Sequence, residues 1–211
     1  LATLPPTAPF QLSVDMAALT DHTLGTTSVS NGFHDGLSRS ATITLDYDAG
    51  GVGWFIGDTV NDNAEFSEAL SDTAFQATEA SAAFGRYDLN TVLSHELVHL
   101  LGFSVDNPRF SSQVRSIDGS KVFAGEGFTV HLTADGDHVD DASHPNDLMN
   151  ELLAPGVRRL PTQLDLQVLR ALRGPSNVSD AALFSAANLI RSTSALTFEK
   201  SETSAVSGIV S

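Results

Sequence analysis

The stretch S94-H-E-L-V-H-L-L-G-F103 constrains this 211-residue chain more than any other. Residues four apart lie on one face of a helix, so His95 and His99 can bind one metal ion together. Glu96 comes directly after the first histidine, and this places its carboxylate beside the metal, where it can act as a general base. The stretch therefore predicts a helix that holds a metal site.

Local signals place this helix at residues 88–102. Asp88 or Asn90 can cap its start, and Gly102 is a suitable C-terminal stop. Apolar residues recur along one side, which predicts a buried face: Leu89, Val92, Leu93, Leu97, Leu100 and Leu101. A chance HExxH occurs in roughly one chain in a hundred of this length. Its agreement with the helical periodicity and with Gly102 favours a metal site.

A catalytic zinc ion needs a third protein ligand. In the short form of the motif, HExxHxxGxxH, a histidine stands three residues after the glycine, where this chain has Val105. Asp106 lies one residue further on, and His138 and His144 lie in an acidic loop downstream. The residues alone leave these three candidates open.

The run HELVHLLG, with D147-L-M-N150 later in the chain, resembles the metzincin metallopeptidases. In that family the chain leaves the active-site helix at the glycine, supplies a third histidine and passes beneath the zinc in a methionine-containing turn. Met149 matches that methionine, and the resemblance implies a hydrophobic floor rather than a ligand. The run A41-T-I-T-L-D46 is similar to the edge strand of matrixin-type members, and LAPGVRRLP at 153–161 is similar to the segment after the Met-turn in many bacterial relatives.

The long insertion before the third ligand resembles the leishmanolysin branch of the same family. There the third histidine precedes the Met-turn methionine by about eleven residues, and His138 stands at that distance from Met149. The resemblance therefore implies His138 as the third ligand, with His144 as the alternative. Some members carry a tyrosine two residues after the methionine that binds the tetrahedral intermediate. Glu151 stands there, so oxyanion stabilisation would fall to zinc and to backbone N–H groups.

The expected fold is α/β (α+β) of the metzincin-like zincin kind. It would combine a twisted, mixed and mostly parallel sheet with the active-site helix and an irregular C-terminal subdomain. The predicted divisions are a linker at 1–9, an N-terminal subdomain at 10–103, a C-terminal subdomain with the third ligand and Met-turn at 104–175, and a Ser/Ala-rich helix and tail at 176–211.

Periodicity predicts further elements within these divisions. Strands are expected at 41–46, 121–123 and 128–132, with a short apolar run at 54–56. Helices are expected within 62–84, at 161–172 and near 179–193.

Composition restricts the partners. A net charge of −15 argues against nucleic acid, and no apolar run reaches the ~18–20 residues of a membrane span. The absence of cysteine excludes disulfides and thiolate zinc ligands. We expect a monomer that is secreted or at the cell surface, its targeting segment absent from this chain.

Acidic runs at 46–48 and 58–65 would suit a structural calcium ion, although a solvated loop is the simpler interpretation. Asp140 and Asp141 either orient His138 or are solvated, and the sequence does not favour one interpretation over the other.

Together these features predict a zinc-dependent endopeptidase that acts on a protein or peptide substrate. Zinc-bound water activated by Glu96 would attack a peptide bond held along an edge strand, with 41–46 as the candidate strand. The competing interpretation is a non-catalytic zinc- or peptide-binding module of a surface protein. A zinc amidase with a non-protein substrate is a third possibility.

Overall fold

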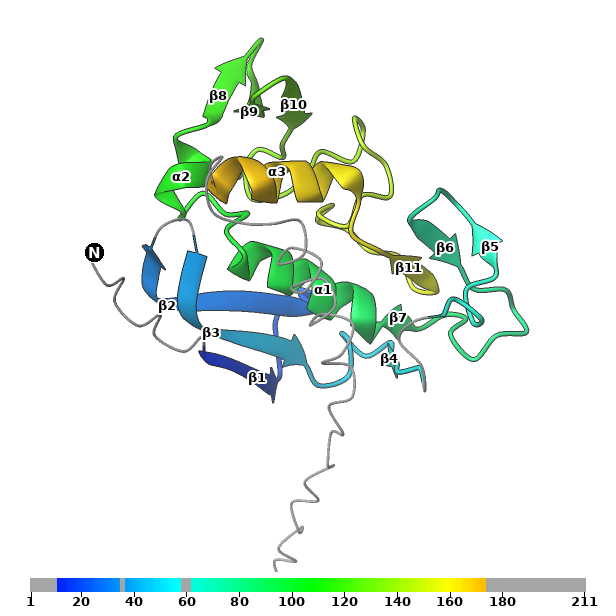
Figure 1. The fold of residues 1–211 in the computed structure, drawn as a ribbon. Coiled ribbons are helices and arrows are strands. Elements are labelled where there is room, and N and C mark those ends of the chain that lie inside the picture. The colour runs from blue at the N-terminus through cyan, green and yellow to red at the C-terminus, as the bar shows by residue number, and fades with distance from the viewer. Residues whose placement is uncertain (1–10, 35–36, 58–61, 174–211) are drawn as a thin grey trace, which may run out of the picture.

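The computed structural model of this protein describes residues 11–34, 37–57 and 62–173. They form a mixed α/β fold with several small sheets and few helices (Figure 1). The helices are α1 (Leu89–Leu100), α2 (Pro108–Ser111) and α3 (Gln163–Arg173). The strands are β1 (Gln11–Ala17), β2 (Gly25–His34), β3 (Leu37–Asp46), β4 (Trp54–Phe55), β5 (Glu68–Ala69), β6 (Ala74–Gln76), β7 (Tyr87–Asp88), β8 (Val114–Ile117), β9 (Ser120–Gly125), β10 (Phe128–His131) and β11 (Val157–Arg159). The predicted linker at 1–9 and the predicted helix near 179–193 lie outside the described residues.

The N-terminal sheet has the order β1-β3-β2 and is mixed. β3 pairs in parallel with β1 and antiparallel with β2. The strand predicted at 41–46 exists within β3, but its prediction as an edge strand is wrong. Residues 11–17, where the sequence signals are weak, pair with the side of β3 that was expected to be free. β2 is therefore the edge strand that lies nearest to α1, the helix of the HExxH motif.

This sheet packs against α1. The alternating residues Ala41, Ile43 and Leu45 of β3 are buried with Leu93 and Leu97 of the helix. Figure 1 shows the three strands below α1, with α3 on its opposite side. The predicted helix is thus sandwiched between the N-terminal sheet and the later part of the chain.

The helix predicted within 62–84 does not form, although the structure describes that whole segment. β5 and β6 form a hairpin there, closed by hydrogen bonds from Leu70 N and Ser71 N to Ala74 O. Ser71 also accepts a hydrogen bond from Thr73 N, a local contact that competes with helical backbone bonding. β6 is fixed further by antiparallel pairing with β11. Long-range pairing has overridden the helical spacing of the apolar residues.

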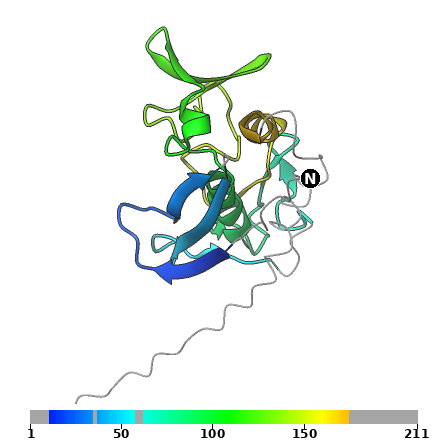
Figure 2. The ribbon, with the colours of Figure 1, turned by 60° about the vertical axis from the view of Figure 1, so that its left-hand side comes forward.

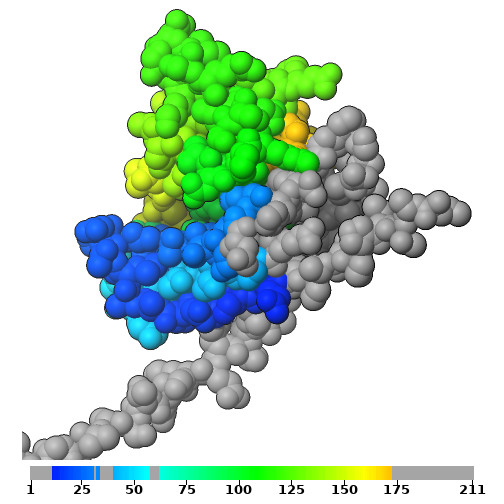
Figure 3. Space-filling model, turned by 90° about the vertical axis from the view of Figure 1, so that its left-hand side faces the viewer, coloured from blue at the N-terminus to red at the C-terminus, as the bar shows by residue number. Residues whose placement is uncertain are grey.

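The insertion after α1 forms α2 and an antiparallel sheet of order β10-β9-β8. The strands predicted at 121–123 and 128–132 correspond to β9 and β10. Phe110, Phe123 and Val130 are buried in a second core, together with residues of α3. Figure 2 shows the green hairpin of the insertion at the top, on the far side of α1 from the blue N-terminal strands. Figure 3 shows the same division on the surface, with the blue strands as the lower part and the green insertion as the upper part.

α3 begins with a capping box. Thr162 N donates to Asp165 Oδ2 at 2.7 Å, and Asp165 N donates to Thr162 Oγ1 at 3.2 Å. The helix predicted at 161–172 therefore starts at Gln163, directly after its cap. None of the helices in the described part of the chain is both long enough and apolar enough to cross a bilayer.

Candidate metal centre

Two of the three histidines at this site are positioned by α1. Asp88 caps the helix by accepting hydrogen bonds from Thr91 N and Thr91 Oγ1. Gly102 has φ 113°, a conformation that L side chains rarely adopt, and the helix ends just before it. Between these ends, His95 and His99 lie one turn apart, and their Nε2 atoms are 3.1 Å from each other.

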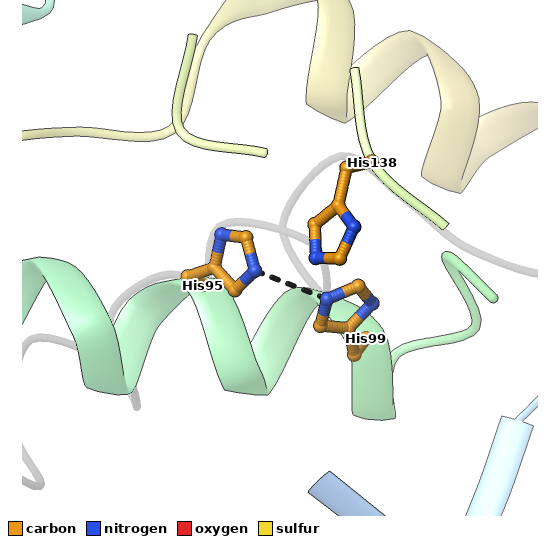
Figure 4. A group of neighbouring side chains, drawn as sticks. All are labelled: His95, His99 and His138. Carbon is orange, nitrogen blue, oxygen red and sulfur yellow. Dashed lines mark hydrogen bonds between the residues drawn. The ribbon is translucent and has the colours of Figure 1, made fainter. Parts of the chain in front are cut away.

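His138 joins them from a loop after β10. The loop is closed by a bridge between Leu132 and Val139 and by a hydrogen bond from Thr133 N to His138 O. One nitrogen from each of the three histidines lies within 4.8 Å of the others. Figure 4 shows the two α1 histidines and His138 converging on one point. These residues form a group that could hold a metal ion.

The hydrogen bonds of the two α1 histidines determine which nitrogen is free. His95 Nδ1 lies 2.9 Å from Leu148 O, and His99 Nδ1 lies 2.8 Å from Phe103 O. A carbonyl only accepts, so each Nδ1 must hold the proton, and each Nε2 presents a lone pair. Two lone pairs 3.1 Å apart repel one another unless a cation lies between them. Two nitrogens bound to one tetrahedral zinc ion at ~2.0–2.1 Å would lie ~3.3 Å apart, which is close to this distance.

Burial keeps these imidazoles neutral, as metal ligation requires. It lowers the pKa of His95 well below its usual value, and the neighbouring His99 acts in the same direction. Burial likewise lowers the pKa of His99 to about 4, with His138 adding to the effect. A hydrogen bond between the two Nε2 atoms would need one ring to be protonated on both nitrogens, which these pKa shifts oppose.

His138 is held by a carboxylate rather than by a carbonyl. Its Nδ1 lies 3.3 Å from Asp135 Oδ2. Asp140, one of the two residues predicted as candidates to orient His138, instead accepts from Ser143 N and Ser143 Oγ. Asp135 stands only three positions before His138 in a tight turn, which brings the two side chains together.

Glu96 is buried beside the histidines. Its Oε2 accepts a hydrogen bond from Thr27 Oγ1 of β2 at 2.8 Å. Burial raises the pKa of Glu96 to about 7, and the Thr27 hydrogen bond opposes this rise. Gly25 permits the close approach of β2, since a Cβ there would lie 3.1 Å from both Glu96 Cγ and Glu96 Oε1. A carboxyl with this pKa can both accept and release a proton near neutral pH.

The turn at residues 147–150 helps to position the candidate ligands. Met149 is fully buried in the core that contains Val98 and Val139, and it contributes no ligand. Asp147 Oδ1 accepts from Met149 N at 2.9 Å, which fixes the turn, and Leu148 O is the acceptor for His95 Nδ1. The turn thus sets the orientation of one candidate ligand through its backbone.

The other candidate ligands lie elsewhere. His144 lines a separate surface hollow with Asp147 and Thr162 and is outside the histidine group. Asp106 is exposed in a cavity next to the site, but it too is outside the group. In the acidic run 46–48, Asp46 accepts from the backbone N–H groups of Leu19, Asp48 and Gly50, which accounts for this carboxylate without a calcium ion. Part of the run 58–65 lies outside the described residues.

Two cavities meet at Glu96 and His138. One has a volume of about 670 Å³ and is lined by β2 residues 25–29 together with His99, Asp106 and Asp137. The other has a volume of about 380 Å³ and is lined by residues 21–25, 148 and 150–153 together with Thr91, His95 and Arg159. The candidate metal centre therefore lies between two cavities that could each receive part of an extended ligand.

The residues that support the candidate ligands have little signal in the sequence. Thr27 and Gly25 lie in a weakly patterned strand some seventy residues before Glu96, and nothing local marks them. The acceptors for His95 and His99 are main-chain carbonyls, which no side-chain pattern records. Only Asp135, close to His138 in a turn, had a readable signal.

Comparison of this chain with protein-family models, with curated proteins and with solved structures finds no match.

Proposed function

We propose that this protein is a zinc-dependent endopeptidase of the metzincin type. One observation supports this most strongly: three imidazole nitrogens converge beside a buried glutamate at the junction of two cavities. A structural zinc site has four protein ligands, whereas three ligands leave an open position for reaction. Met149 is fully buried directly after Leu148, whose carbonyl accepts from His95, and this is consistent with a Met-turn.

The ligand set favours zinc among the common metals. Neutral imidazoles suit zinc, copper, iron and nickel, while magnesium and calcium prefer oxygen ligands. Both α1 histidines present Nε2 with Nδ1 fixed by a carbonyl, and His138 is supported by Asp135, an arrangement common around protein zinc sites. A zinc ion bound here would polarise a peptide carbonyl and lower the pKa of water beside Glu96.

Glu96 has the environment of a general base. One carboxylate oxygen is held by Thr27, and the other can take a proton and then deliver it to the leaving amine. Thr27 Oγ1 also lies 2.9 Å from Glu96 O, so its single proton is shared between this carbonyl and the carboxylate, and β2 contacts both the side chain and the backbone of Glu96. The carboxylate therefore needs little reorganisation during the reaction.

The edge strand β2 offers a track for an extended substrate. β2 starts at Gly25, which lines both cavities, and runs past Val29 along the larger one. A peptide that adds to this edge would place its main chain across the metal centre. β2 therefore takes the place of residues 41–46, which lie in the central strand β3, as the candidate substrate-binding strand.

The test compares wild type, Glu96→Gln and the control Glu126→Gln, which changes an exposed glutamate in the β9–β10 turn. Each protein is loaded with zinc, its metal content is measured, and it is incubated with a proteome-derived peptide pool read by mass spectrometry. Wild type and Glu126→Gln should cleave, while Glu96→Gln should hold zinc and lose ~10²–10⁴-fold in rate. Zinc in all three proteins with no cleavage by any would overturn the proposal in favour of a binding module.

A further inference from the structure

The two consecutive arginines of β11, Arg158 and Arg159, differ in how many of their guanidinium N–H groups are hydrogen-bonded. Arg158 is 3% exposed, and its Nε and Nη2 donate to the two oxygens of Asp88, each at 2.9 Å. Its Nη1 donates to Asp62 O, and its guanidinium lies 4.3 Å from the centre of the Phe66 ring. Every side of this cation is therefore occupied, and its role is structural.

The side chain of Arg159 lies on the opposite face of β11 from that of Arg158, since successive side chains in a strand alternate between the two faces. It is 8% exposed, and among the described residues its guanidinium makes a single hydrogen bond, from Nη1 to Leu152 O at 2.8 Å. Arg159 Nε is buried and has no hydrogen-bond partner among the described residues. A guanidinium has five N–H donors, and an unpaired buried charge is costly. The surroundings of Arg159 are thus incomplete without a further acceptor.

The position of Arg159 indicates where that acceptor comes from. Arg159 lines the cavity of about 380 Å³ that also reaches His95, Glu96 and His138. Within the described residues it forms no ion pair; burial lowers its pKa, and the more distant Asp141 and Asp147 only oppose that shift. The cavity therefore has one buried cation with unused donors, next to the candidate metal centre.

We propose that this cavity binds an acidic side chain of the peptide substrate, with the Arg159 guanidinium as the specificity-determining group. The proposal rests on the proposed endopeptidase function and names the substrate class of the same site. A glutamate or aspartate carboxylate would accept hydrogen bonds from the free donors of Arg159. Such charge-assisted contacts are stronger than neutral ones and discriminate against the amide analogue.

The direction of β2 assigns this side chain to one side of the scissile bond. β2 runs from the Arg159 cavity, at Gly25, towards the larger cavity, at Val29. Antiparallel pairing is the commoner way for a strand to join an edge, and it makes the peptide run in the opposite direction. The residue in the Arg159 cavity then lies on the C-terminal side of the scissile bond.

Besides Glu96, which lies beside the candidate metal centre, two exposed carboxylates line the cavity but do not cancel this preference. Asp21 and Glu151 are exposed, so water and salt screen their repulsion of an incoming carboxylate. Arg159 acts from a buried position, where screening is weaker and an electrostatic contact is larger.

The test uses the zinc-loaded full chain and a proteome-derived peptide pool. Cleavage positions are compared for wild type, Arg159→Met, Arg159→Lys and the control Arg115→Met, which removes a positive charge from exposed β8. In parallel, the pool is passed over immobilised Glu96→Gln protein, with and without Arg159→Met, and the retained peptides are sequenced. Circular dichroism establishes that each variant is folded.

Wild type should cleave before Glu or Asp about 10- to 100-fold more often than before Gln or Asn. Arg159→Met should reduce this ratio to near one, Arg159→Lys should retain part of it, and Arg115→Met should leave it unchanged. Cleavage without an acidic preference, or with a preference that survives Arg159→Met, would overturn the inference while leaving the peptidase intact. Acidic peptides retained through Arg159 without any cleavage would support the binding site and refute the peptidase. Neither cleavage nor selective retention would overturn both.

Discussion

Replacing Asp88 by asparagine separates two roles of one buried carboxylate. Asp88 is 1% exposed, accepts two hydrogen bonds from Arg158, and caps α1 through Thr91. Asparagine preserves a capping oxygen but leaves the Arg158 guanidinium buried without its counter-charge. Removing one partner of a buried ion pair costs ~3–5 kcal/mol, a large part of the ~5–15 kcal/mol that stabilises a typical domain.

Urea unfolding monitored by far-UV circular dichroism measures this loss. We expect Asp88→Asn to lower the free energy of unfolding by ~3–5 kcal/mol without a change in its dependence on urea. Adding Arg158→Met removes the stranded charge, so the double variant should be more stable than Asp88→Asn alone. The exposed Asp72→Asn serves as a control and should change stability by less than ~0.5 kcal/mol.

Two results would refute this reasoning. A loss below ~1 kcal/mol for Asp88→Asn would mean that the pair behaves like a solvated surface ion pair. A double variant less stable than Asp88→Asn would mean that Arg158 stabilises the fold by its packing and by its bond to Asp62 O, independently of its counter-charge.

Three further expectations concern the site and its supporting strands. Gly25→Ala adds a Cβ 2.9 Å from Val92 Cγ1 and 3.1 Å from Glu96 Cγ and Oε1, so β2 must move away from α1 and kcat/KM for peptide cleavage should fall at least ~10-fold with zinc content unchanged; a wild-type rate would show that β2 can shift without cost. Asp135→Asn weakens the support of the third histidine and should reduce zinc affinity ~10–100-fold in chelator competition, whereas unchanged affinity would remove Asp135 from the site. Backbone hydrogen bonds, that from Gly50 first, lower the pKa of Asp46 to about 2, so its stabilising effect is complete above pH ~4 and is lost as the pH falls towards 2. Thermal unfolding should therefore find Asp46→Asn less stable than wild type at pH 7, with a difference that shrinks steadily as the pH falls from ~4 through 2, and a constant difference would contradict the assignment.

The motif helix could be predicted because its signals are local. The cap at Asp88, the apolar face and the stop at Gly102 all lie within about fifteen residues, and each acts through contacts inside that segment. The same is true of β9 and β10, whose alternation and turn residues lie side by side in the sequence. The secondary structure of segments with local signals can therefore be predicted without knowledge of any tertiary contact.

Elements decided by distant pairing were predicted less well. Residues 68–76 form a hairpin because β6 pairs with β11, some eighty residues later. The strand at 41–46 lies in the middle of its sheet because β1 pairs with it, although β1 shows little pattern of its own. Such pairings depend on the whole fold, and no window of sequence contains both partners.

The third histidine illustrates the difference between a ligand and its surroundings. His138 was selected through resemblance, by its separation from Met149, since spacing within the chain left Asp106 and His144 open. The structure brings it to His95 and His99 through two bridges, Leu132 with Val139 and Val139 with Asn150. The candidate ligand can be identified in the sequence, but its position beside His95 and His99 depends on contacts between β10 and the turn at 147–150.

Two main-chain carbonyls determine which ring nitrogen is protonated in His95 and in His99. Leu148 O and Phe103 O hold the protons on Nδ1 of His95 and His99, and so direct both Nε2 lone pairs to one point. Every residue has a carbonyl, so substitution at these two positions leaves the acceptors in place as long as the backbone does not move. Asp147 restrains that backbone by joining Met149 N to Thr162 Oγ1 at the start of α3. The candidate site therefore consists of three histidines and a glutamate, while the tautomers of His95 and His99 depend on how α1, the turn and α3 pack together.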